Sequence, residues 1–226
     1  RNLEIYKTLY NLAENENFTL LIAKFRIADS KYNAGLFTQP LSEEIISNDS
    51  KAFWQIIKQL YFPESSYSFA VFSSDILGHI YEIFLGQQLK LENGSVQLKK
   101  KPEIEDRDVV TTPTFIVRDI LNETIKKFCD GKSDEEIFNS KFADIACGSG
   151  AFLLEAFQLL QDILVDYYMV NDSSKLIQTG INNFKLKFEV KKQILLRCIF
   201  GVDKDFNAVE ACKFGLLLKL LEYEDN

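Results

Sequence analysis

The chain has 226 residues, of which 46% are hydrophobic and 26% charged, a composition that favours a packed globular core over disorder. Its formal net charge of −7 argues against a stand-alone DNA-binding domain, because such domains usually carry a basic surface. It contains no run of about 18 apolar residues and no signal-peptide segment, so we expect a cytoplasmic protein that makes no membrane contact.

Cysteine and histidine usage argues against a metal site. The cysteines are widely spaced and form no C-x-x-C pair, which excludes the usual zinc patterns and favours reduced thiols at Cys129, Cys147, Cys198 and Cys212. Because His79 is the only histidine, neither a histidine-based triad nor a histidine-rich metal site is possible. We therefore predict no metal ligand in this chain.

Residues 1–108 are predicted to form a mainly helical region that ends in a linker. A helix capped by Asp49 or Ser50 is expected to bury Phe53, Trp54, Ile57 and Leu60. A second helix over 76–85 follows a Ser-Ser-Asp cap and carries an apolar face. Residues 95–100 alternate as in a short strand, and the charged segment 102–108 contains a proline and is typical of a linker.

Residues 109–226 alternate helical and strand patterns, as in an α/β fold. Thr112 is predicted as an N-cap and Pro113 as the first residue of a helix that ends near Gly131. A buried strand at 142–146 leads through a glycine turn into a long helix. The remaining elements are expected in the order of a loop at 170–185, a short helix at 190–196, a second buried strand at 198–203 and a helix at 207–221.

The most informative segment is the glycine turn at 144–152, with the sequence D-I-A-C-G-S-G-A-F. A backbone without side chains lets a ligand approach closely, and a helix N-terminus offers unpaired N–H groups to it. Asp144 directly before the turn would repel a pyrophosphate, whereas it suits a ligand that carries hydroxyl or amino groups. This combination points to S-adenosylmethionine rather than NAD or ATP.

Asp203 is expected to end the second strand, beside the glycine turn, at the edge where open α/β sheets bind ligands. A carboxylate there can accept two hydrogen bonds from ribose hydroxyls. In dinucleotide-binding folds the acidic residue follows the glycine motif by about 20 residues, whereas Asp203 lies 53 residues after Gly150. Taken alone, either feature is an ordinary strand–helix connection or a solvated acid. Together they favour a nucleoside site.

Four segments in this order resemble motifs of N6-adenine-specific DNA methyltransferases of restriction–modification systems. Residues 144–152 resemble motif I (D-P-A-C-G-S-G-x-F), 112–117 resemble motif X (T-P-x-x-I/V-V), and 200–209 resemble motif II (G-V/I-D-x-D-x-x-A-V). Residues 77–86 are similar to the L-G-x-x-Y-E-x-x-L element of type IIG enzymes. Type I modification subunits carry a related element. The resemblance implies a Rossmann-like, S-adenosylmethionine-dependent methyltransferase domain over 109–226.

The resemblance also assigns roles to individual residues. Thr112 and Pro113 would flank the methionine end of S-adenosylmethionine, and Asp203 would hold its ribose. Lys204 stands where an apolar residue often covers the adenine ring, so its aliphatic stem would take that role. The floor of the site and the end of motif I would be formed by Asp144, Cys147, Gly148, Gly150 and Phe152. Ile145 replaces the proline that is usual in motif I.

The catalytic tetrapeptide N/D-P-P-Y/F of this family, which receives a flipped-out adenine, is missing. The chain has four prolines and no Pro-Pro pair, and it ends at Asn226, 23 residues after Asp203. Because it also begins with Arg1 rather than methionine, we expect an N-terminal piece of a longer bacterial enzyme. This piece would hold the cofactor half of the site, contain no catalytic residue, be inactive alone, and contact DNA mainly through parts of the parent outside this chain.

Two further functions remain open at this level. The methyltransferase could act on RNA or protein instead of DNA, or the chain could be a non-catalytic helical interaction module with a vestigial cofactor pocket. The two predicted strands would leave an open sheet edge, so we also expect the isolated chain to be marginally stable, to self-associate, or to be stabilised by its N-terminal helices.

Overall fold

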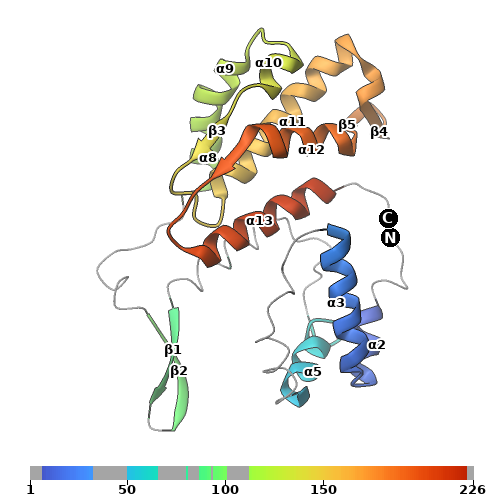
Figure 1. The fold of residues 1–226 in the computed structure, drawn as a ribbon, viewed down its shortest axis with the longest axis vertical. Helices are drawn as coiled ribbons and strands as arrows, with labels where there is room; N and C mark the ends of the chain where they lie inside the picture. Colours follow the sequence, from blue (N-terminus) through green and yellow to red (C-terminus); the bar gives the residue numbers. More distant parts are fainter. Residues whose placement is uncertain are drawn as a thin grey trace. The chain divides into compact units, whose positions relative to one another are not determined.

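The computed structural model describes residues 7–32, 50–65, 80, 87–92, 94–100 and 112–222. The chain divides into two compact units, residues 1–72 and 73–226, and each is described by itself (Figure 1). The predicted helix at 76–85, apart from residue 80, and the predicted linker at 102–108 lie outside the described residues. The predicted domain boundary at 108/109 lies there too and stays a prediction.

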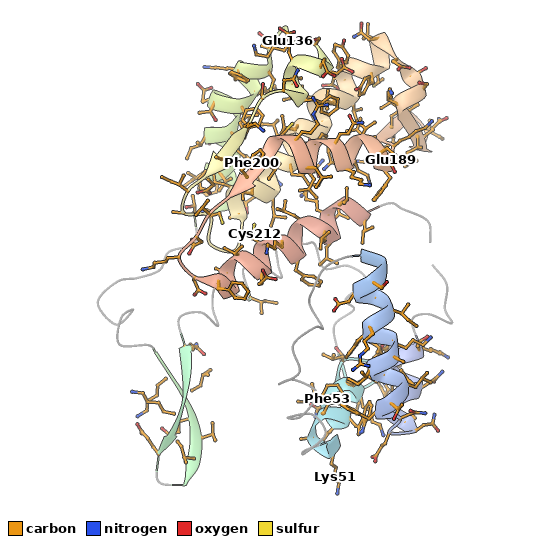
Figure 2. All side chains as sticks on the ribbon, in the orientation of Figure 1. Lys51, Phe53, Glu136, Glu189, Phe200 and Cys212 are labelled. Carbon is orange, nitrogen blue, oxygen red and sulfur yellow. The ribbon has the colours of Figure 1, made fainter. Side chains whose placement is uncertain are left out.

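Unit 1 is a small helical cluster built around Trp54. Helices α2 (Thr8–Glu14), α3 (Phe18–Tyr32) and α5 (Ser50–Gln59) bury five side chains between them, Leu12, Ala13, Leu21, Trp54 and Ile57. The Phe53 ring packs edge-on against Trp54, with ring centroids 5.2 Å apart (Figure 2). The predicted helix at Ser50 is confirmed, with Trp54 and Ile57 buried as expected and Phe53 only partly buried. The expected burial of Leu60 is wrong: this residue follows the last helical residue and is 43% exposed.

A two-stranded antiparallel hairpin follows, formed by β1 (Gln87–Glu92) and β2 (Ser95–Lys100). The strand predicted at 95–100 is confirmed. The partner strand β1 was not predicted, although apolar and polar residues alternate in β1 as well. Leu91 is opposite Val96 in the ladder, and both side chains are exposed.

A long helical segment opens the larger part of unit 2. It consists of α8 (Thr114–Leu121), the π-helical turn η2 (Asn122–Lys126) and α9 (Lys127–Cys129). Pro113 is the N-cap, with φ −56° and ψ 138°, so the helix begins one residue later than predicted. The predicted end is confirmed, because Gly131 has a left-handed φ of 71°.

The spacing of the buried residues explains the π-helical turn. Val117, Leu121, Ile125 and Cys129 are all buried, and each follows the previous one by four residues. Four residues exceed one α-helical turn by roughly 40° of rotation, so in a regular α-helix this stripe would rotate away from the core. The wider π turn brings Ile125 and Cys129 back to the buried face.

The core of unit 2 is built around α11 (Ala151–Asn171), which contacts α8, α12 (Phe188–Cys198) and α13 (Phe206–Leu221) (Figure 1). Helix α10 (Asp134–Phe138), which the sequence patterns did not predict, begins with a capping box formed by Ser133 and Glu136. The fully or nearly fully buried side chains of α11 include Leu153, Leu154, Phe157, Leu160 and Leu164.

Strands β3 (Phe142–Asp144) and β6 (Ile199–Gly201) form a parallel pair in which Asp144 is opposite Gly201. Both are shorter than predicted. The expectation that both strands are buried is wrong: in β3, Phe142 and Asp144 are half-buried and Ala143 is exposed, and in β6 only Ile199 is buried while Phe200 and Gly201 are exposed. Ala143 and Phe200 are paired neighbours, so their side chains lie on the same face of the pair, and this face is exposed.

The predicted loop at 170–185 is also wrong. The helix α11 continues to Asn171, and the 3-10 turn η3 (Ser173–Lys175) leads into a hairpin of β4 (Leu176–Gly180) and β5 (Asn183–Leu186). Leu176 and Leu186 are opposite each other and buried in the core. The polar residues between them occupy exposed strand positions and a two-residue turn, which made the segment look like a loop.

The described chain is therefore mostly helical with small two-stranded sheets, which is consistent with the predicted α/β class. A Rossmann-like sheet of several strands is not among the sheets of the described ranges. No helix within those ranges is long and apolar enough to cross a membrane.

Candidate functional site

The two parallel strands bring the glycine turn and Asp203 together. Beyond the last pair of the ladder, the Val202 amide donates to the Asp144 carbonyl at 2.9 Å, and the Cys147 amide donates to the Val202 carbonyl at 3.0 Å. The segment after β3 and the segment after β6 therefore continue side by side past the strand ends. This is the carboxyl edge at which parallel α/β sheets place their ligands.

The turn itself requires glycine at two positions. Gly148 and Gly150 have left-handed φ values of 52° and 95°, a region that residues with a side chain rarely adopt. The Gly150 amide donates to the Cys147 carbonyl at 2.8 Å, and the Gly150 carbonyl accepts the first bond of α11 from Leu154. The Asp144 carboxylate accepts a bond from the Ala146 amide at 3.0 Å, so it holds the entry to the turn.

Close packing against α13 adds a second requirement at Gly150. A Cβ atom there would overlap the sulfur of Cys212, which lies on α13 (Figure 2). At Gly201 in β6, a Cβ atom would lie 2.5 Å from Cδ1 of Leu153 and 3.1 Å from Sγ of Cys147. The backbone of the site is thus packed from two sides, and there is no room for side chains at these glycines.

Asp203 is held as a carboxylate by backbone N–H groups. Its Oδ2 accepts from the Gly148 amide at 2.9 Å, and its Oδ1 accepts from the Asp205 amide at 2.8 Å. The bond from Asp205, followed by that from Gly148, lowers the pKa of Asp203 below its ordinary value. Since each carboxylate oxygen has a second lone pair, Asp203 can still accept hydrogen bonds from hydroxyl groups of a ligand.

The thiols near the turn are not suited to nucleophilic chemistry. The Cys147 and Cys212 thiols are both buried, and the Cys147 thiol donates to the Gly148 carbonyl at 3.7 Å. Burial raises the pKa of Cys147, and the charges of Asp144 and Asp203 raise it further. Burial raises the pKa of Cys212 to about 12. Both thiols are therefore protonated at neutral pH, whereas a cysteine that acts as a nucleophile or a metal ligand must be a thiolate.

A groove of about 520 Å³ lies beside Asp144, a volume in the range of small-molecule sites. It is lined by residues of β3, of the α8–η2 segment and of the start of α11. Most of these are apolar: Leu121, Thr124, Ile125, Lys141, Phe142, Ala143, Asp144, Ile145, Phe152, Leu153 and Ala156. Two of the predicted site residues, Asp144 and Phe152, thus line this groove.

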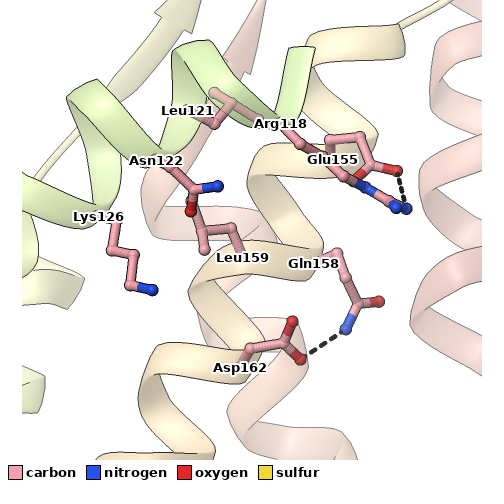
Figure 3. Close-up of a pocket in the computed structure, with 8 residues that line it drawn as sticks. All are labelled: Arg118, Leu121, Asn122, Lys126, Glu155, Gln158, Leu159 and Asp162. Atoms are coloured by element: carbon pink, nitrogen blue, oxygen red, sulfur yellow. Dashed lines mark hydrogen bonds and ion pairs between the residues drawn. The ribbon is translucent and has the colours of Figure 1, made fainter. Parts of the chain in front are cut away.

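An ion pair connects the two helices that border this groove. Nε of Arg118 on α8 lies 2.8 Å from Oε2 of Glu155 on α11, and Nη2 of Arg118 lies 3.2 Å from Oε1 (Figure 3). The Glu155 side chain is only 9% exposed, whereas that of Arg118 is 61% exposed. Both residues of the pair line a separate pocket of about 390 Å³.

The structure brings together only some of the predicted site residues. The hydrogen-bonded cluster at the strand ends contains Asp144, Cys147, Gly148, Gly150 and Asp203. Phe152 lies in the first turn of α11, and Lys204 is exposed directly after Asp203. Thr112 and Pro113 lie at the N-terminus of α8, outside this cluster. The binding roles of all nine residues stay predictions.

Sequence reasoning missed four residues that shape the site. Cys212 and Gly201 pack against the turn, and Arg118 and Glu155 join the bordering helices. The contacts of Cys212, Arg118 and Glu155 involve partners 37 residues or more away along the chain and follow no short motif. Gly201 stands inside the motif II segment, where its position before Asp203 was the available signal. No group of histidine, cysteine, aspartate and glutamate suited to a metal ion occurs in the described part of the chain.

Comparisons with known proteins connect the chain to one curated enzyme. The chain is 58% identical over 225 residues, 99% of its length, to the Type II restriction enzyme and methyltransferase RM.Eco57I of Escherichia coli. It spans 22% of the length of that protein. No family model matches the chain. No solved structure matches it either.

Proposed function

We propose that this chain carries the cofactor-binding half of an S-adenosylmethionine-dependent DNA methyltransferase of a restriction–modification system, and that the whole protein methylates N6 of adenine. The observation that carries the proposal is the hydrogen bond between the Gly148 amide and the Asp203 carboxylate. It joins the two segments that resemble motifs I and II. The 58% identity to a restriction enzyme and methyltransferase supports the same class.

The chemistry of the cluster fits S-adenosylmethionine. An ionised carboxylate at Asp203 suits the two ribose hydroxyls, and the bare backbone at Gly148 and Gly150 permits close approach. Asp144 suits an amino-bearing ligand without phosphates. When bound, the cofactor would supply the methyl group that is transferred.

The remaining site residues would complete the binding surface. Thr112 and Pro113 would meet the methionine end, the stem of Lys204 would cover the adenine ring, and Phe152 would line the apolar groove beside Asp144. No residue of the chain is assigned a role in the transfer step. The protein's part in that step would be to orient donor and acceptor.

DNA is the proposed substrate because the motif order X, I, II resembles that of N6-adenine-specific DNA methyltransferases. The chain itself has a net charge of −7, so we propose that most of the DNA contact lies elsewhere in the whole protein. Its resemblance to the type IIG element at 77–86 supports a restriction–modification role.

Isothermal titration calorimetry of the 226-residue chain with S-adenosylmethionine tests the cofactor assignment. Asp203→Ala is expected to weaken binding by at least about tenfold, because both ribose hydroxyls lose their acceptor. Asp166→Ala, an exposed substitution on α11, is the control and should bind like the unmodified chain. Equal affinity of Asp203→Ala and the unmodified chain would refute the assignment of the ribose acceptor.

The base specificity is tested on the whole protein that contains this chain. After incubation with DNA and S-adenosylmethionine, nucleosides from the digested DNA are separated and identified by mass spectrometry. We expect N6-methyladenine. Methylcytosine as the product, or transfer to RNA or protein with none to DNA, would contradict the proposal.

A further inference from the structure

The Arg118–Glu155 ion pair occupies equivalent places in two helices. Helix α8 begins directly after Thr112 and Pro113, and α11 begins directly after Gly150. Arg118 and Glu155 each stand four residues after the first residue of their helix. The pair therefore lies one helical turn from both segments that are proposed to contact the cofactor.

The geometry of this pair is restrictive. Both carboxylate oxygens of Glu155 accept from the Arg118 guanidinium, at 2.8 and 3.2 Å, so the planar fork sets direction as well as distance. The carboxylate is nearly buried at 9% exposure. A sliding or rotation of α8 along α11 would leave that charge without its partner, which is strongly unfavourable in a buried place.

Apolar side chains of both helices lie next to the pair: Leu121 of α8 is buried in the core, and Leu159 of α11 packs against that core. The pocket beside the pair is lined by Leu121 and Leu159 together with the polar residues Asn122, Lys126, Gln158 and Asp162 (Figure 3). Gln158 and Asp162 bond each other at 2.9 Å within α11, not across to α8. The Arg118–Glu155 pair is thus a polar contact between α8 and α11 that adds a fixed direction to their apolar packing.

We propose that Arg118 and Glu155 are positioning residues, which hold the Thr112–Pro113 segment at the distance from the glycine turn that the methionine end of S-adenosylmethionine requires. This inference rests on the proposed function. The two residues act through the helices that they join and do not touch the cofactor. Loss of the pair should therefore affect the methionine half of the ligand and spare the nucleoside half, which Asp203 holds.

Two ligands and four variants of the 226-residue chain test this inference by calorimetry. S-adenosylmethionine has the methionine end, and 5′-methylthioadenosine lacks its amino acid part. Arg118→Met and Glu155→Gln break the pair. The double variant Arg118→Met/Glu155→Met leaves no unpaired charge and replaces the pair by apolar side chains, so it is expected to remain folded. Glu135→Gln is the control, because it removes the Arg197–Glu135 ion pair between α12 and α10 in the same unit.

Positioning predicts a selective loss of affinity. The double variant should bind S-adenosylmethionine at least about tenfold more weakly than the unmodified chain, while 5′-methylthioadenosine binds within about twofold of it. The two single variants should show the same selectivity where they fold, as judged by circular dichroism. Glu135→Gln should bind both ligands like the unmodified chain.

The possible outcomes separate this inference from the proposed function. If the unmodified chain binds neither ligand, the proposed function fails and the inference fails with it. If it binds both and the folded double variant does so equally well, the pair has no positioning role while the proposed function stands. A parallel loss for both ligands in the double variant would show a general structural role and would also overturn the inference.

Discussion

Gly150 combines a backbone requirement and a packing requirement at one residue. Its φ of 95° is unfavourable for any residue with a side chain, and its α-carbon faces the sulfur of Cys212 on α13. Gly131 has a similar φ of 71°, but nothing lies within 4 Å of the place where a Cβ atom would be. The two glycines therefore allow backbone strain to be separated from steric overlap.

Alanine at these two positions is expected to differ in its effect on stability. Gly131→Ala should lower the free energy of unfolding by about 1 kcal/mol through left-handed strain alone. Gly150→Ala should lower it by about 3 kcal/mol, because overlap with Cys212 is added. Urea denaturation followed by circular dichroism measures both. Cys212→Ala in the Gly150→Ala background should recover part of the loss, and equal effects of the two glycine substitutions would contradict the packing argument.

Asp203 predicts a dependence of stability on pH. The amides of Asp205 and Gly148 lower the pKa of Asp203 in the folded chain. The carboxylate therefore stabilises the fold at pH values above 3.8, the ordinary pKa of this group. That contribution is lost as the pH falls through the lowered pKa. Asp203→Asn should therefore be less stable than the unmodified chain by about 1 kcal/mol at pH 7.

The difference between these two proteins should begin to shrink as the pH falls below about 3.8, where the unfolded chain takes up a proton at Asp203, and it should be smallest below the lowered pKa of the folded chain, where both proteins carry a neutral side chain at this position. Denaturation curves recorded between pH 7 and pH 3 measure it. Asp166→Asn on α11 controls for the loss of one exposed charge. A difference for Asp203→Asn that stays constant over this pH range would exclude the carboxylate as its source.

Among the elements, the π-helical turn η2 behaves as a one-residue insertion in an otherwise α-helical segment. Deleting the exposed Thr124 would change the spacing between Leu121 and the next buried residue from four to three. The buried residues would then follow the four-three-four spacing of a regular α-helix. The same kind of deletion in α11 has no such compensation, because that helix is regular.

We expect the Thr124 deletion to lower the melting temperature by no more than about 5 °C. Deleting the exposed Asp162 from α11 should have a much larger effect, since it rotates Leu164 and Tyr168 out of the core. Differential scanning calorimetry of both deletion variants measures the contrast. Unfolding of the Thr124 variant at ordinary temperature would show that η2 is required for the fold itself.

For the whole molecule, the short sheet raises the question of association. Within the described ranges, β3 pairs only with β6, and its other side borders the apolar groove. Backbone groups and apolar side chains along such an edge favour pairing with another strand. Ile145, which lines the groove and is 84% exposed, is suited to test this.

The 226-residue chain is expected to self-associate as its concentration rises, and Ile145→Lys should reduce this by placing a charge at the edge. Ile181→Lys is the matched control, because Ile181 is 95% exposed in the β4–β5 turn, outside the groove. Sedimentation velocity over a range of concentrations gives the masses. A monomer at every concentration, combined with a sharp thermal transition, would contradict the expectation.

The elements that sequence reasoning placed correctly depend on neighbouring residues. The strands at 95–100 and 142–144, the helix from Phe206 and the helix end at Gly131 each follow from alternation, periodicity or a left-handed glycine within a few residues. The hairpin at 176–186 was missed because its two buried leucines are ten residues apart with mostly polar residues between them. They identify a hairpin only once they are seen opposite each other in the fold. The π turn was missed because it forms to keep Ile125 and Cys129 on the buried face of the helix, and the sequence does not show where the core lies relative to that helix.

The sequence by itself determined the local frame of the candidate site: an acid, a turn that needs glycine, a helix after it and a second acid at Asp203. These features arise from residues adjacent in the chain, whose backbone preferences act without distant partners. Only the tertiary structure decided that the Gly148 amide bonds Asp203, that Cys212 closes the space at Gly150, and that Arg118 joins Glu155. Each of these contacts unites residues far apart in sequence, and their distances are set by how the helices pack on the strand pair.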